Sequence, residues 1–171
     1  GLQNDVVDLT RELIQTPSAS FEESAAAEVV ERSMKQLGYN KVFRDEAGNV
    51  VGIISGIEGG SSALLTGHLD TVPPGDEQNW SHKPYSGDVA DGAVHGVGAA
   101  DCKGGIAAQV YAGALLKRSL LPLKGDLVVA ATVAEANGRS IGVRTLMEKT
   151  LPDLGISPQC AILGEPTGLG L

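Results

Sequence analysis

Apolar residues recur at three- and four-residue spacing in four stretches of the chain, a period typical of amphipathic helices. The first stretch is followed by Thr16-Pro17-Ser18, which ends a helix, and the second is followed by Gly38, a common residue after a helix C-terminus. The sequence therefore predicts helices over residues 4–15, 22–37, 103–118 and 139–149.

Between these stretches lie short apolar runs of the length expected for strands. A hairpin is predicted from residues 41–44 and 50–54, joined by the turn Glu46-Ala47-Gly48-Asn49, and a second turn spans residues 55–62. Further strands are predicted at residues 63–66, 126–133 and 160–163, the last of them buried. Helices that alternate with apolar strands indicate an α/β fold, with a mixed, largely parallel sheet covered by helices on both faces.

Two stretches lack this periodicity. Residues 72–100 are rich in Pro, Gly, Asp and polar side chains and contain Trp80, the only tryptophan. A loop of this length inside a compact domain is commonly functional. Residues 164–171 are rich in turn formers and follow a strand that looks central, so the sequence looks cut short.

Composition excludes several classes of protein. The 171 residues are 42% hydrophobic and 20% charged, with 13 Lys and Arg against 21 Asp and Glu, a formal charge of −8. The absence of a basic run argues against nucleic acid as a partner. No apolar run approaches the ~20 residues of a membrane span, and no signal peptide is visible, so we expect a cytoplasmic protein without membrane contact. Cys102 and Cys160 do not form a disulfide framework.

Acidic and imidazole side chains gather at predicted strand ends and at a helix entry. His68-Leu69-Asp70 and Glu135 each follow an apolar strand, as does Glu165, and Asp101 precedes a helix. One imidazole with several carboxylates suits Zn²⁺ at a catalytic site that keeps an open position. Each piece alone has a simpler interpretation: a surface loop or hydrogen-bonded pair, a helix cap, a solvated carboxylate or a turn residue. Their joint occurrence in one short chain favours a metal site.

The motifs around these residues resemble the M20 metallopeptidase family, which includes acetylornithine deacetylase, succinyl-diaminopimelate desuccinylase, aminoacylase and carboxypeptidase G. The similarity runs from about residue 6 to the last residue, with the motifs in the family's order. It is carried by LLTGHLDTVPPG (64–75), Trp80, Pro84-Tyr85-Ser86-Gly87, Asp91-Gly92, GVGAADCKGG (96–105) and AILGEPTGL (161–169), the last resembling the deacetylase branch in particular. The resemblance implies a zinc-exopeptidase-like catalytic domain.

The resemblance also implies a role for each residue. His68 would ligate one zinc with Asp70 as its orienting partner, Asp101 would bridge two zincs, and Glu165 would complete the first site. Glu135 would be the general base that takes a proton from the attacking water. The Asp101–Cys102 peptide is often cis in such sites. One or two Zn²⁺ ions are expected, with Co²⁺ able to substitute.

The implied activity is zinc-dependent hydrolysis of the amide bond of an N-acyl amino acid or short peptide, as in a deacetylase. Two departures from the family bear on it. The family pattern has adjacent glutamates, the base and then a ligand of the second zinc, where this chain has Glu135-Ala136. Either Glu135 is the base and the second site lacks a ligand, or Glu135 is the ligand and Ala134 occupies the position of the base.

The second departure is length. The resemblance leads us to expect a single partial catalytic domain over residues 1–171. The lid or dimerisation domain and the final catalytic segment, which carries a further zinc-ligating histidine in the family, would be absent from it. His82 and His95 do not match that histidine and are expected to be loop residues. A homodimer of the full-length protein would form through the missing domain. The alternative is a degenerate or truncated relative without turnover, which would act as a weak metal-binding or interaction module.

Overall fold

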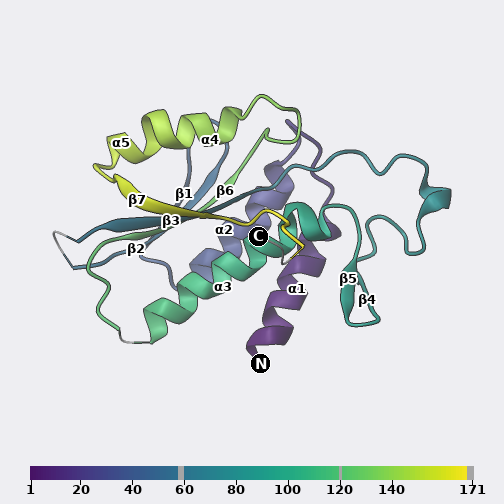
Figure 1. Ribbon diagram of the computed structural model, residues 1–171, viewed down its shortest axis with the longest axis horizontal. Coiled ribbons are helices and arrows are strands. Elements are labelled where there is room, and N and C mark those ends of the chain that lie inside the picture. Colours follow the sequence, from purple (N-terminus) through teal and green to yellow (C-terminus); the bar gives the residue numbers. More distant parts are fainter. Residues whose placement is uncertain (58–59, 120, 169–171) are drawn as a thin grey trace.

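The computed structural model describes residues 1–57, 60–119 and 121–168 and shows a twisted five-stranded sheet with helices on both faces (Figure 1). The strand order is β1-β2-β6-β3-β7. Their bounds are β1 Lys41–Arg44, β2 Val50–Ile54, β3 Ser62–His68, β6 Leu127–Thr132 and β7 Pro158–Leu163. The β1–β2 and β2–β6 pairs are antiparallel, whereas β3 pairs parallel with both β6 and β7. The expected mixed α/β sheet is thus confirmed.

Three helices cover one face of the sheet: α1 (Leu2–Ile14), α2 (Ser24–Gln36) and α3 (Gly104–Arg118). Their apolar side chains form the larger core with β2, β3 and β6, and its fully buried members include Leu13, Val30, Met34 and Val110. The other face packs on the helical stretch of α4 (Ile141–Thr145), Leu146–Thr150 and α5 (Leu151–Asp153), where Leu146 and Leu151 contact Val51, Leu64 and Val128. All four predicted helical stretches are present, and the last continues to Asp153.

The expectation of a buried last strand is wrong. Residues 159–163 are all exposed, and Ile162 and Leu163 expose 62% and 61% of their surface. The reason is position, because β7 is the edge strand of the sheet in the described part of the chain. The stretch at residues 72–100 is also more regular than expected: the short strands β4 (Asp88–Ala90) and β5 (Ala93–His95) form a hairpin beside the main body, so His95 lies in a strand (Figure 1).

Parallel pairing of β3 with β6 and β7 places the carboxyl ends of these three strands at one edge of the sheet. Ligands of open α/β sheets gather at such an edge. Residues 58–59 of the predicted turn at 55–62 lie outside the described residues, as do residues 169–171 at the end of the stretch 164–171. Within the described ranges, no helix combines the length and the apolar character needed to cross a membrane.

Candidate metal centre

His68 is the last residue of β3, where it pairs with Thr132 of the neighbouring strand β6. Its side chain is buried, and the ring nitrogens are oriented by oxygen atoms on both sides. Nδ1 lies 2.8 Å from the backbone oxygen of Asp70, and Nε2 lies 2.9 Å from Oδ1 of Asp101. Such a pair of contacts fixes the ring plane and leaves Nε2 directed toward the acidic cluster.

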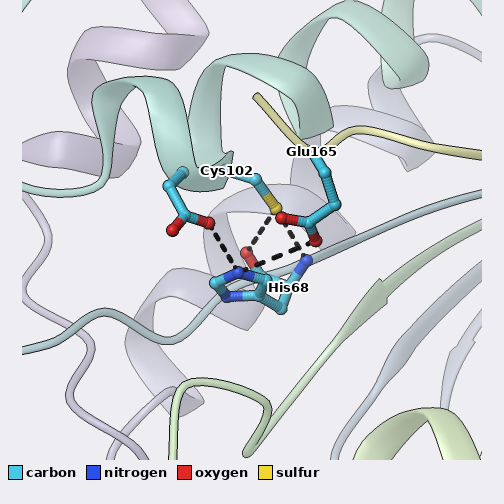
Figure 2. A group of neighbouring side chains, drawn as sticks. His68, Cys102 and Glu165 are labelled. Carbon is cyan, nitrogen blue, oxygen red and sulfur yellow. Dashed lines mark hydrogen bonds and ion pairs between the residues drawn. The ribbon is translucent and has the colours of Figure 1, made fainter. Parts of the chain in front are cut away.

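Four potential ligands converge around Nε2. One ligand atom from each of His68, Asp101, Cys102 and Glu165 lies within 4.8 Å of all the others. Figure 2 shows the side chains of His68, Cys102 and Glu165 close to one another. Nε2 of His68 is 2.9 Å from Asp101 and 3.9 Å from Oε1 of Glu165. Tetrahedral ligands about 2.1 Å from Zn²⁺ lie roughly 3.4 Å apart, between these two distances. The two distances from His68 therefore bracket the ligand spacing of a metal site.

The position of Asp101 is fixed by the two residues that follow it. The Asp101–Cys102 peptide is cis, as the resemblance implies. The Cys102 sulfur accepts the backbone N–H of His68 at 2.9 Å, and a Cβ on Gly67 would lie 2.9 Å from this sulfur, so glycine is required there. The buried Lys103 ammonium donates to the carbonyl oxygens of Leu13 and Thr16 at the end of α1. Cys102 thus ties the end of β3 to the turn that bears Asp101.

Glu135 follows β6 and faces the same space. A cavity of about 90 Å³ is lined by Thr66, Gly67, His68, Thr132, Glu135, Val143, Leu163 and Glu165. One carboxylate oxygen of Glu135, Oε1, accepts the hydroxyl of Ser140 at 2.9 Å, while Oε2 is buried and has no hydrogen-bond partner among the described residues. A buried polar atom without a partner is rare and calls for a ligand, an ion or water.

The fully buried Asp70 carboxylate lies next to two residues that line this cavity, His68 and Glu135. It accepts the backbone N–H groups of Glu135 at 3.0 Å and Ala136 at 2.8 Å, and the hydroxyl of Ser20 at 2.6 Å. The Oδ1 atom of Asp70 is 3.4 Å from Nδ1 of His68, whereas the backbone oxygen of Asp70 is 2.8 Å from the same nitrogen. Asp70 therefore contacts both His68 and the backbone that bears Glu135.

The contacts in the site change the pKa values of His68 and Asp70. Burial opposes the charged form of His68, but contacts with Asp70 and Cys102 outweigh it and raise the pKa of His68 to about 11. Burial likewise opposes ionisation of Asp70, but His68, Ser20 and the two backbone N–H groups lower its pKa to about 2. The site thus stabilises positive charge at His68. A metal ion must displace the His68 proton, so metal affinity should fall as the pH falls.

The structure brings the predicted site residues together: His68, Asp101 and Glu165 lie in one cluster, Glu135 lines the adjoining cavity, and Asp70 contacts both His68 and Glu135. His82 and His95 lie apart from this cluster, with their rings stacked at 4.0 Å and His82 bonded to Asp88. Sequence reasoning assigned no role to Cys102, Ser20 or Ser140. Of these three residues, only Cys102 could have been singled out from the sequence, because it directly follows the predicted ligand Asp101.

Comparison with known proteins agrees with this geometry. The family model described as Peptidase family M20/M25/M40 matches residues 64–170. A succinyl-diaminopimelate desuccinylase from Bradyrhizobium sp. (strain ORS 278) is 36% identical over 171 residues, which covers 95% of this chain and 44% of that protein. The chain spans 40–44% of the length of the curated relatives it matches.

Two solved structures share the fold. The M20 family metallo-carboxypeptidase Sso-CP2 from Sulfolobus solfataricus matches with a TM-score of 0.78 at 20% identity, over 94% of this chain and 37% of that one. The YXEP protein of Bacillus subtilis, a dinuclear metal binding peptidase from the M20 family, matches with a TM-score of 0.68 at 21% identity, over 91% and 41%. At these identities the matches show the fold alone.

Replacement of Asp70 by Asn should destabilise the chain, because the amide NH₂ would face a backbone N–H that needs an acceptor. We expect the free energy of unfolding to fall by about 2–3 kcal/mol in urea denaturation. Because the folded pKa of Asp70 lies below its ordinary 3.8, its contribution is present above about pH 4 and is lost as the pH falls toward 2. Asp70→Asn should remove this pH dependence.

The matched control is Asp8→Asn, a replacement of the same kind at a side chain that is 71% exposed. This control should leave the free energy of unfolding unchanged. Equal stability of the two variants would contradict the role given to Asp70.

Proposed function

Because this chain belongs to peptidase family M20/M25/M40, we propose that it forms the first part of the catalytic domain of a zinc-dependent hydrolase. The proposed reaction is hydrolysis of the amide bond of an N-acyl amino acid or short peptide. The observation that carries the proposal is the convergence of His68, Asp101 and Glu165 at ligand spacing beside the free, buried oxygen of Glu135. The lid or dimerisation domain and the final catalytic segment would belong to the rest of a longer protein.

The donor set fits zinc. One imidazole nitrogen and two carboxylates are N/O ligands that Zn²⁺ and Co²⁺ both accept, and three protein ligands leave a position open. The imidazole is buried, whereas the Asp101 and Glu165 side chains are 61% and 43% exposed. Substrate could therefore approach from the carboxylate side. When bound, the ion would supply Lewis acidity that polarises a carbonyl and activates water at neutral pH.

Glu135 is proposed as the general base. Its Oε2 has no partner in the part of the chain that the structure describes, and it can hold a proton taken from water before passing it to the departing amine. Its Oε1 is held by Ser140, and its backbone N–H by Asp70.

Asp70 would act on both halves of the site. The pKa of its carboxyl is lowered to about 2, so it is ionised at neutral pH and favours the orientation of His68 in which Nε2 faces the ligand cluster. The same carboxylate holds the backbone of Glu135. The convergence of these groups supports a working hydrolase over the alternative of a degenerate relative without turnover.

The name of one relative suggests which acyl groups to test. The Bradyrhizobium protein is named a succinyl-diaminopimelate desuccinylase, so N-succinyl as well as N-acetyl amino acids belong in a substrate panel, together with dipeptides. A deacetylase specificity is part of the proposal. The cytoplasmic location and the homodimer remain predictions about the full-length protein.

Glu135→Gln tests the role of the base. In the zinc-loaded full-length protein we expect turnover of the best substrate of that panel to fall at least about 100-fold, because glutamine cannot accept a proton. The zinc content, measured by atomic absorption, should not change. Glu148→Gln, at a side chain that is 69% exposed, is the control and should keep full activity. Loss of zinc together with activity would identify Glu135 as a ligand instead.

Ala136→Glu tests the missing second ligand. The side chain of Ala136 cannot coordinate a metal, whereas the family pattern has a glutamate there. We expect the full-length variant to bind one more equivalent of zinc than the parent, as measured by metal analysis after equilibrium dialysis. Ala136→Gln, of similar size but without charge, should gain none. If Ala136→Glu shows an unchanged metal content, a missing ligand at this position cannot be what limits zinc binding.

A further inference from the structure

We propose that Ser140 is a positioning residue that holds the carboxylate of Glu135 toward the ligand cluster. This inference rests on the proposed function, in which Glu135 is the general base. The Ser140 hydroxyl donates to Oε1 of Glu135 at 2.9 Å, and Oε2 is left buried and free in the cavity shared with His68 and Glu165. One oxygen of the base is thus fixed while the other remains available for a proton.

The local geometry of Ser140 departs from what its place in the sequence favours. Ser140 directly precedes α4 and is its N-cap residue, where a serine ordinarily has extended backbone angles and accepts an N–H of the first turn. Here its side chain makes no capping hydrogen bond, and its backbone is left-handed, with φ 49° and ψ 36°. The hydroxyl reaches Glu135 instead of the helix, so this arrangement forgoes local stability.

A second left-handed residue lies on the other side of Glu135. Ala134 has φ 54°, and only four non-glycine residues of the described chain have a positive φ, of which Ala134 and Ser140 lie within five positions of Glu135. Backbone strain of this kind persists only where the surroundings impose it, and it is concentrated at functional sites. Strained backbone at Ala134 and at Ser140, on both sides of Glu135, indicates that the position of the Glu135 carboxylate is what the loop conformation serves.

The backbone around Glu135 is already fixed without Ser140. The N–H of Ala134 donates to the buried Glu23 at 2.9 Å, and those of Glu135 and Ala136 donate to Asp70. The remaining freedom is in the side-chain torsions of Glu135, and a glutamate keeps substantial rotamer entropy unless its end is held. Among the described residues, the Ser140 hydroxyl is the group that donates a hydrogen bond to the Glu135 carboxylate. A base must lie within hydrogen-bond reach of the proton it takes, and misplacement by about 1 Å can lower the rate by 10²-fold.

A positioning role and a purely structural role predict opposite results for Ser140→Gly. Glycine accepts left-handed backbone angles without strain, so this variant should keep or raise the melting temperature, by about 2 °C. It lacks the hydroxyl, so kcat should fall about 10- to 100-fold with KM and zinc content unchanged. A purely structural hydrogen bond would instead make activity follow stability, and the glycine variant would be as active as the parent.

Two further variants and a control complete the test, all in the zinc-loaded full-length protein with the best substrate of the panel. Ser140→Asn tolerates left-handed angles and carries an N–H donor, so it should recover most of kcat. Ser140→Ala keeps the strain and loses the donor, so its kcat should fall as in the glycine variant without the gain in melting temperature. Asp91→Gly, at a left-handed residue (φ 51°) in the β4–β5 turn, should leave kcat unchanged.

A glycine variant with full kcat, or an asparagine variant no better than alanine, would overturn the proposal for Ser140. If Glu135→Gln keeps its turnover, the assignment of the base fails, and the role of Ser140 fails with it. If Glu135→Gln is inactive while Ser140→Gly has the kcat of the parent, only the proposal for Ser140 fails. The two failures are therefore distinguishable.

Discussion

The fully buried carboxylate of Asp70 connects the end of β3 to two loops that are distant in sequence. Its two oxygens accept hydrogen bonds from Ser20 and from the backbone N–H groups of Glu135 and Ala136. Burial of a charge is unfavourable unless hydrogen bonds and an opposite charge compensate for it, and His68 lies beside the same carboxylate. The folded chain must therefore bring these groups together, which places His68 and Glu135 on either side of Asp70.

This constraint explains why the candidate site is divided into two parts that adjoin each other. The ligand part comes from the ends of β3 and β7 and from the turn before α3, held by Cys102 and Lys103. The other part is the loop after β6, whose successive N–H groups are held by Glu23 and Asp70. Parallel pairing of β6, β3 and β7 brings the two parts to one edge of the sheet. The left-handed backbone at Ala134 and Ser140 indicates that the loop is shaped for the orientation of Glu135 rather than for local stability.

Much of the fold and of the candidate site could be predicted from the sequence, because helices and strands follow local apolar periodicity. The burial of each strand could not be predicted in this way. The apolar run at residues 160–163 looks the same in sequence whether β7 is a central strand or an edge strand. The hairpin in the long loop had a signal in Asp91-Gly92, the type of pair that joins two short strands. The resemblance implied Asp70 as the orienting partner of His68. It gave no sign that the same carboxylate also accepts the backbone N–H groups of Glu135 and Ala136. The partners of Cys102 and Asp70 lie 34 and 65 residues away, and no local pattern reveals such contacts.

The central claim is that His68, Asp101 and Glu165 form a metal site within this chain. Calorimetric titration of the 171-residue chain with zinc, alongside His68→Ala and His82→Ala, tests it most directly. The account predicts saturable binding of about one equivalent by the parent chain, its loss in His68→Ala, and its retention in His82→Ala, since His82 lies outside the ligand cluster. Absence of saturable binding by the parent chain, or binding that persists in His68→Ala, would contradict it.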